Sequence, residues 1–384
     1  MQFFFFHLMP WKYLPEDFEE TYGGVAWGLP NHFYDPKKGN ILYNEYLDEL
    51  EYADRLGYDG ICVNEHHQNA YGNMPSPNII AATLARRTEQ AKIAILGNAL
   101  PLRDNPIRVA EEIAMLDVIT GGRIISGFVR GVGAEYHATG VNPNDSRARF
   151  NEAHDMIVHA WTTQGRSYFE GEFYNGYYVN IWPRVFQEPH PPIWIPSSGS
   201  RETIEWTTKM RYVYLQTYNA YETVKKNLLL YHQLAEEMWG YTASPYQLGW
   251  ALPIYVAETD EQALEEAYEG LDTLFNKLIR SPLELRFPPG YVSEKSEQVV
   301  ISQKKRTSGK NSVESLLRDG YALVGSPKTV IERLCTYQEE MNFGNMIATL
   351  QFATLSHDKT MNNLKMFAER VIPEVRRLVN MNAS

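Results

Sequence analysis

Residues 60–67, GICVNEHH, decide the fold of this chain. They open with the apolar run 60–63, which follows an amphipathic helix pattern ending at Leu56-Gly57. A helix followed by a short apolar strand is the building unit of parallel α/β sheets. Ligands bind at the carboxyl ends of such strands, and neighbouring strand residues point to opposite faces. We therefore expect His66 or His67 to face a ligand while the other braces it; a histidine packed in a polar shell is the plainer alternative.

Strand and helix patterns alternate along almost the whole chain. The eight strand candidates are residues 2–7, 60–64, 92–100, 123–130, 193–197, 212–217, 249–257 and 345–351. Eight strands, each with a helix after it, predict an α/β fold of the (β/α)8 TIM barrel type with loop insertions, in which residues 1–384 form one domain. An open Rossmann-like sheet is the alternative. No strand leads into a complete G-x-G-x-x-G, because Tyr136 stands in the third glycine's place after Gly131 and Gly133.

Helix boundaries are marked by capping residues. Residues 46–56 form one helical pattern, and Asn105-Pro106 opens another that stops at Gly121-Gly122. Asp145 or Ser146 begins a third helix, and Ser200 begins a fourth that runs through Trp206.

Three stretches interrupt the alternation. Residues 8–44 predict a long loop after the first strand, and residues 165–191 predict a polar and aromatic hairpin. Residues 281–312 contain few apolar side chains and predict a mobile active-site lid, with a disordered surface insertion as the alternative.

Composition excludes several classes of protein. A formal net charge of -11 argues against nucleic-acid binding, because phosphate contacts need clustered lysine and arginine. No apolar segment approaches the ~20 residues of a membrane span. The two cysteines, Cys62 and Cys335, lie in apolar strand and helix patterns, which favours reduced thiols in a cytoplasmic protein and predicts no metal site.

Two features predict anion binding at one rim of the sheet. Arg130 ends the fourth strand next to Gly131, and its planar guanidinium could hold a phosphate or pair with a loop carboxylate. The turn Ser197-Ser198-Gly199-Ser200 leads from the fifth strand into a helix, whose N–H groups and dipole could cradle a phosphate; Ser200 could equally be an ordinary helix cap. Taken together, the two features favour one phosphorylated cofactor, and flavin mononucleotide (FMN) fits.

These motifs, in this order, resemble the bacterial luciferase-like flavin-dependent monooxygenase family. The matching blocks are Glu65 to His67, Leu100-Pro101 with Asn105-Pro106, Glu111 to Asp117, Gly121 to Arg123, Gly127 to Gly131, Tyr136 to Gly140, Ser146-Arg147, Ser197 to Ser200, Gly325 to Pro327 and Phe367 to Pro373. The resemblance covers nearly the whole chain and is specific to the family, not to a substrate. Luciferases carry an acidic residue where this chain has Ser197, which weakens an assignment to bioluminescence.

The resemblance implies a barrel that uses dissociable reduced FMN, supplied by a separate flavin reductase, to activate O2. Carried over by motif, Arg130, Tyr136 and the turn of Ser197, Ser198, Gly199 and Ser200 would bind the cofactor, with Gly97 and Asn98 against its ring system. Relatives have a non-proline cis peptide near that strand end, and the small residue here is compatible with one. His66 matches the family histidine beside the reactive edge of the flavin, with Glu65 or His67 fixing its orientation.

The expected reaction is insertion of one oxygen atom into a small organic substrate through a flavin C4a-(hydro)peroxide. Aromatic residues in the loops favour an apolar or aromatic substrate. A deazaflavin (F420)-dependent hydride-transfer oxidoreductase on the same barrel and a non-catalytic flavin-binding subunit are the alternatives. The family also implies a homodimer formed by helices that flank the early strands.

Overall fold

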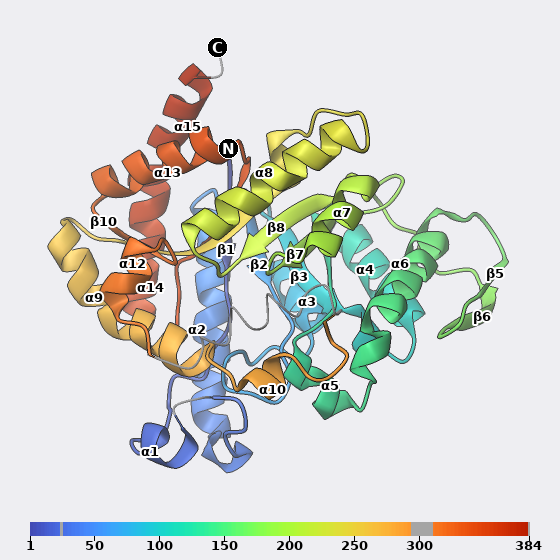
Figure 1. The fold of residues 1–384 in the computed structure, drawn as a ribbon, viewed down its shortest axis with the longest axis horizontal. Helices are drawn as coiled ribbons and strands as arrows, with labels where there is room; N and C mark the ends of the chain where they lie inside the picture. The colour runs from blue at the N-terminus through green and yellow to red at the C-terminus, as the bar shows by residue number, and fades with distance from the viewer. Residues whose placement is uncertain (24–25, 293–309, 383–384) are drawn as a thin grey trace.

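Eight parallel strands close into a barrel in the computed structural model, which describes residues 1–23, 26–292 and 310–382 (Figure 1). The barrel strands are β1 (Gln2–Phe6), β2 (Gly60–Val63), β3 (Lys92–Ala99), β4 (Ile124–Val129), β7 (Ile193–Ser197), β8 (Val213–Thr217), β9 (Leu248–Val256) and β11 (Asn345–Thr349). They pair in the order β1-β2-β3-β4-β7-β8-β9-β11, and β11 pairs again with β1. The predicted (β/α)8 barrel is confirmed, and each predicted strand end lies within two residues of the observed one.

The first strand shows how the alternation of side chains fills the barrel. Phe4 contacts Trp194 of β7 with ring centroids 5.1 Å apart, although three strands separate β1 from β7 in the sheet. This contact crosses the interior, so Phe4 points inward. Phe3 points outward and packs on Phe367 near the carboxyl end of the chain.

Helices surround the barrel and return the chain to the start of the next strand. They are α1 (Phe18–Tyr22), α2 (Pro36–Arg55), α3 (Pro77–Arg87), α4 (Pro106–Thr120), α5 (Gly133–Thr139), α6 (Ser146–Thr162), α7 (Arg201–Met210), α8 (Tyr221–Glu237), α9 (Asp260–Thr273), α10 (Leu283–Arg286), α12 (Val313–Arg318), α13 (Pro327–Met341), α14 (His357–Met366) and α15 (Ile372–Asn382). The predicted starts at Asn105 and Ser200 are confirmed, since each side chain accepts a hydrogen bond from a backbone N–H of its helix.

The prediction for residues 8–44 is wrong in part. Helix α2 begins at Pro36, ten residues before the predicted pattern, and α1 lies within the expected loop. Asp35 caps α2 by accepting hydrogen bonds from Lys37 N and Lys38 N. The cap followed by proline is the same signal as Asn105-Pro106, but Gly39 and Asn40 behind it are poor helix formers and obscured it.

Two smaller strand elements lie beside the barrel. The predicted hairpin is present as β5 (Ser167–Glu170) and β6 (Asn175–Val179), which stands away from the barrel in Figure 1. Strand β10 (Leu323–Gly325) was not predicted and pairs in parallel with β9.

The described part of the predicted lid packs over the start of α5. A Cβ on Gly133 would lie 2.3 Å from Pro288 Cδ and 2.4 Å from the carbonyl oxygen of Arg286, so the segment from α10 to Tyr291 sits directly on this glycine. Figure 1 shows α10 beside α5. Residues 293–309 of the predicted lid lie outside the described residues.

Within the described residues, none of the helices combines the length and the apolar character needed to cross a membrane. Both cysteines are free; Cys62 is buried in β2, and burial raises the pKa of its thiol well above its usual value.

Candidate active site

The triplet after β2 places its side chains on two faces. Gly60 of β2 faces Phe4, which points into the barrel. Because every second residue of a strand points to the same face, the side chain of His66, six residues further on, is expected on that face too. Glu65 points the other way and contacts His67, Arg103 and the N–H of Ala99. The expectation that the two histidines serve different purposes is consistent with this geometry.

His66 is oriented by a carboxylate that the sequence analysis did not single out. Its Nδ1 lies 3.1 Å from Glu135 Oε1, and the Glu135 side chain is only 1% exposed. Glu135 also accepts hydrogen bonds from His67 N at 3.2 Å and Val132 N at 2.7 Å. Because a carboxylate only accepts, Nδ1 of His66 donates, which leaves Nε2 with a lone pair in the neutral ring. The partner that fixes His66 is therefore Glu135, rather than Glu65 or His67.

His67 belongs to a separate ion-pair network. Its Nε2 lies 2.7 Å from Glu65 Oε1, and the other oxygen of Glu65 pairs with Arg103. The hydrogen bond to Glu65 raises the pKa of His67. The Glu65 side chain is fully buried, so both partners are needed to compensate its charge.

The imidazole of His66 packs against an aromatic side chain. Tyr71 packs edge-on against it with ring centroids 4.6 Å apart. Burial raises the pKa of the Tyr71 hydroxyl well above its usual value, and the nearby Tyr218 raises it further. The Tyr218 hydroxyl is 3.4 Å from Thr349 Oγ1 at the end of β11. His66 thus faces a desolvated region where phenolic hydroxyls stay protonated.

The end of β3 has the backbone feature implied by the resemblance. The Leu96–Gly97 peptide bond is cis. A Cβ on Gly97 would lie 2.5 Å from the Gly127 carbonyl carbon, so the two glycines allow β3 and β4 to approach closely. Asn98 is fully buried, yet neither its Oδ1 nor its Nδ2 has a hydrogen-bond partner among the described residues. An orphaned buried amide at a strand end fits a ligand with polar ring atoms.

Arg130 lies at the end of β4 with part of its guanidinium available. Its Nη1 donates to Ser146 Oγ at 3.2 Å and to the Tyr291 carbonyl at 3.1 Å. Its Nε and Nη2 have no acceptor within the described chain. The predicted alternative, a salt bridge to a loop carboxylate, is absent among these residues, so the arginine remains suited to an anion.

A second arginine adds positive charge at the same rim. Arg147 is the second residue of α6, next to Ser146, and its Nη2 lies 3.9 Å from Glu202 Oε2 in the first turn of α7. Burial and then the positive charge of Arg130 lower the pKa of Arg147. Arg147 thereby links the Arg130 side of the rim to the start of α7.

In the serine turn at the end of β7, the predicted helix cap at Ser200 is confirmed. Ser200 caps α7, accepting from Thr203 N, and Ser197 Oγ accepts from Gly199 N. The exposed Ser198 hydroxyl has no partner among the described residues. Gly199 has φ +106°, and a Cβ there would lie 2.3 Å from Asn227 Nδ2, so only glycine permits this turn.

Tyr136 holds the backbone of Arg130. Its side chain is buried, and its hydroxyl donates a hydrogen bond to the carbonyl oxygen of Arg130. It therefore holds the backbone that presents the guanidinium.

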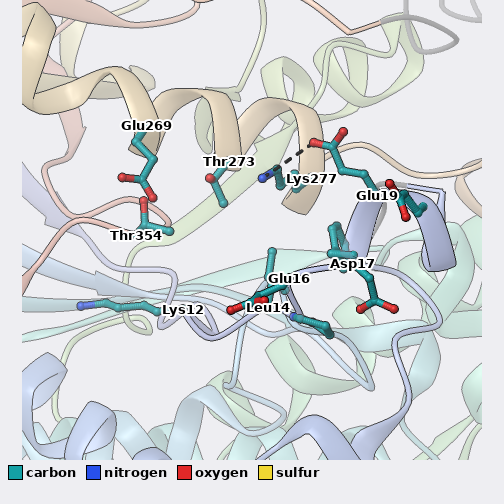
Figure 2. Close-up of a pocket in the computed structure, with 12 residues that line it drawn as sticks. Lys12, Leu14, Glu16, Asp17, Glu19, Glu269, Thr273, Lys277 and Thr354 are labelled. Carbon is teal, nitrogen blue, oxygen red and sulfur yellow. Dashed lines mark ion pairs between the residues drawn. The ribbon is translucent and has the colours of Figure 1, made fainter.

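A cavity of about 690 Å3 lies between α9 and the chain that follows β1 (Figure 2). Glu269 and Thr273 of α9 and Lys277 in the turn after it line one side, while Lys12 and Glu16 after β1 line the other. Its lining is mostly charged, which suits a polar ligand better than an apolar one. None of the predicted site residues lines it.

Two site residues escaped the sequence analysis as individuals. Glu135 is three residues after the cap position Val132, where a glutamate commonly folds back on the helix start, so a signal existed. The sequence analysis named Arg147 only as part of the block Ser146-Arg147, one of those that resemble the family. Across residues 1–23, 26–292 and 310–382, no group of three His, Cys, Asp or Glu side chains could hold a metal ion.

The chain belongs to the luciferase-like monooxygenase family, whose family model matches residues 26–341. The alkanal monooxygenase β chain of Vibrio harveyi is 28% identical over 208 residues, which cover 54% of this chain and 63% of that protein. Limonene 1,2-monooxygenase of Rhodococcus erythropolis is 23% identical over 364 residues, covering 92% and 87% of the two chains. The chain spans about half to two thirds of the length of the first curated relatives it matches.

Solved structures share the barrel. The oxygenating constituent of 3,6-diketocamphane monooxygenase from a Pseudomonas putida plasmid, in complex with FMN, has a TM-score of 0.72 at 18% identity, covering 97% of this chain and 98% of that one. An F420-dependent secondary alcohol dehydrogenase has a TM-score of 0.66 at 15% identity, covering 98% and 99%. At these identities the similarity establishes the fold.

Proposed function

We propose that this protein is the oxygenase component of a two-component flavin-dependent monooxygenase, which uses reduced FMN and O2 to insert one oxygen atom into an organic substrate. One observation carries the proposal. His66, whose ring is oriented by the Glu135 carboxylate, and Arg130, which has donors available for an anion, lie at the ends of the nearby strands β2 and β4 of one barrel. Family membership supplies the reaction class.

The described residues fit a phosphate-tailed flavin. Arg130 offers its Nε and Nη2 donors, and the turn of Ser198 to Ser200 adds a hydroxyl and the start of α7. The unpaired amide of Asn98 can hydrogen-bond polar atoms of a ring system. When bound, reduced flavin supplies the electrons and the site that activates O2.

His66 is the group we propose to handle the proton. Nδ1 is held by Glu135, so Nε2 accepts or donates a proton toward the barrel mouth. Tyr71 packs against the ring and excludes water from it. Tyr71 also supports the predicted apolar or aromatic substrate, since its ring lies beside His66.

The test is oxygen consumption with chemically reduced FMN and candidate substrates, with product analysis in 18O2. We expect one labelled oxygen atom in the product. His66→Ala should bind FMN as the wild type does and form product more slowly; unchanged turnover would remove His66 from the mechanism.

The second candidate is hydride transfer with a deazaflavin, favoured by the similarity to the F420-dependent dehydrogenase fold. Anaerobic turnover with reduced or oxidised F420, and none with FMN and O2, would establish it instead. A flavin-binding subunit without activity would bind FMN but show neither reaction.

Further parts of the proposal concern partners and organisation. We propose a separate flavin reductase, a cytoplasmic location, and one domain with a lid at 281–312. We also propose a homodimer, supported by three large apolar side chains exposed on the outer face of α4: Met115, Val118 and Ile119.

A further inference from the structure

We propose that Tyr291 is a positioning residue that fixes the Arg130 guanidinium so that its Nε and Nη2 edge is presented to the phosphate of the cofactor. The inference rests on the proposed function, and it adds a residue from the described part of the 281–312 segment to the cofactor site.

Tyr291 contacts Arg130 in two ways. Its carbonyl oxygen accepts from Nη1 at 3.1 Å, and its ring lies over the guanidinium with Cζ 4.5 Å from the centroid. A guanidinium has five N–H donors in one plane. Contacts at Nη1 and at the face leave the Nε and Nη2 edge without an acceptor among the described residues, and this edge offers the two parallel donors that match a phosphate.

Tyr291 is itself held in place by the rim. Its hydroxyl donates to the Gly131 carbonyl at 2.6 Å, and its ring meets Tyr136 edge-on at 5.5 Å. Tyr136 in turn donates to the Arg130 carbonyl. The backbone of residues 130–131 and the guanidinium are thus held by the same pair of tyrosines.

The segment that carries Tyr291 requires a glycine beneath it. A Cβ on Gly133 would come within 2.3 Å of Pro288 Cδ, and a Cβ on Gly290 within 2.0 Å of Asn144 Oδ1. Seating of the segment and orientation of Arg130 are therefore coupled. Binding energy from a phosphate is greatest when its donors are already oriented.

The experiment compares FMN with riboflavin, which lacks the phosphate, by fluorescence titration of the purified full chain. The wild type should bind FMN more tightly than riboflavin. Tyr291→Ala should weaken FMN binding about tenfold and leave riboflavin binding unchanged, because the cation–π contact and the orientation of Arg130 are lost together. Tyr291→Phe keeps the ring and the carbonyl, so it should retain most of the preference for FMN.

Gly133→Ala tests the same coupling without touching Tyr291. It should lower the preference for FMN as Tyr291→Ala does, because the added methyl group prevents the segment from seating. The matched control is Tyr178→Ala on the hairpin, which removes another arginine–tyrosine contact, Arg166 over Tyr178 at 5.3 Å, and should change neither affinity.

The outcomes separate this inference from the function on which it rests. Equal losses for FMN and riboflavin in Tyr291→Ala, no loss at all, or tighter FMN binding would overturn the role of Tyr291; the last would mean that it competes with the phosphate. A wild type that binds both ligands equally would overturn the phosphate site itself. Circular dichroism melting checks that each variant is folded.

Discussion

Replacing Glu135 by Gln tests how His66 is activated. Glu135 accepts three hydrogen bonds, of which the one from Val132 N is the shortest at 2.7 Å. Glutamine has nearly the same shape, but one of its two terminal atoms donates. Placing the amide nitrogen at the Oε2 position would set it 2.7 Å from the Val132 N–H donor, whereas placing it at the Oε1 position sets it 3.2 Å from the His67 N–H donor. The closer conflict is the costlier one, so the amide oxygen stays against Val132 and the nitrogen turns toward His66.

This orientation reverses the tautomer of His66. Nδ1 must now accept from the amide, so the proton of the neutral ring moves to Nε2, and the lone pair that faces the barrel mouth is lost. General acid–base catalysis contributes about 10²–10⁴-fold, and a wrong tautomer forfeits most of it. We therefore expect turnover to fall by about 10²-fold or more.

The assay is the rate of product formation from reduced FMN and O2, together with FMN affinity, which should not change because Glu135 does not belong to the phosphate site. Glu152→Gln is the control. Glu152 also accepts three hydrogen bonds, from the backbone N–H groups of Glu172, Phe173 and Tyr174, but it supports the hairpin. Wild-type turnover in Glu135→Gln, or an equal loss in Glu152→Gln, would refute the assigned role.

Three further predictions concern stability. The hydrogen bond to Glu65 raises the pKa of His67 above its value in the unfolded chain. The stability that this hydrogen bond contributes is therefore complete below about pH 6.5 and is lost as pH rises through the folded pKa. The difference in free energy of unfolding between wild type and His67→Gln, from urea titrations, should shrink from pH 5.5 to 8.5, and a difference that grows would contradict this. Glu49 is fully buried and accepts hydrogen bonds from His7 Nε2 at 2.7 Å and His357 Nδ1 at 2.9 Å. Burial lowers the pKa of His7, so Glu49→Ala leaves a buried N–H donor without a partner and should lower the free energy of unfolding by about 1–3 kcal/mol; an unchanged free energy would show that these hydrogen bonds do not stabilise the fold. In Gly127→Ala the new Cβ would lie 2.1 Å from the Ile95 carbonyl oxygen, which is backbone and cannot rotate away. We expect the free energy of unfolding to fall by about 1–3 kcal/mol in the same titration. Wild-type stability would mean that β3 and β4 can move apart at no cost.

Much of the barrel could be predicted because strand signals are local. Each barrel strand is an apolar run bounded by turn residues, and the caps at Asn105 and Ser200 fix where helices begin. Strand β10 has only three residues, too few to show a pattern. Helix α2 was predicted too short because Gly39 and Asn40 lower the local helix propensity, and the buried face of α2 outweighs this only once the barrel is formed.

Residues of the candidate site could be proposed from the sequence only where they follow a strand closely. His66 and Arg130 do so, and both lie at the rim. The partner of His66 is Glu135, 69 residues away, and the partner of Arg130 is Tyr291, 161 residues away. Pairings at such separations arise from the closure of the barrel and from the path of a loop, neither of which leaves a periodic trace in the sequence.

The central claim is that the rim holds a phosphate-tailed flavin with its ring system beside His66. A crystal structure of the FMN complex tests it most directly. We expect the phosphate within hydrogen-bond distance of Arg130 Nε and Nη2 and of the Ser198 to Ser200 turn, with the ring system against Asn98 and His66. A phosphate bound elsewhere, for example at Lys12 in the charged cavity, would contradict the claim.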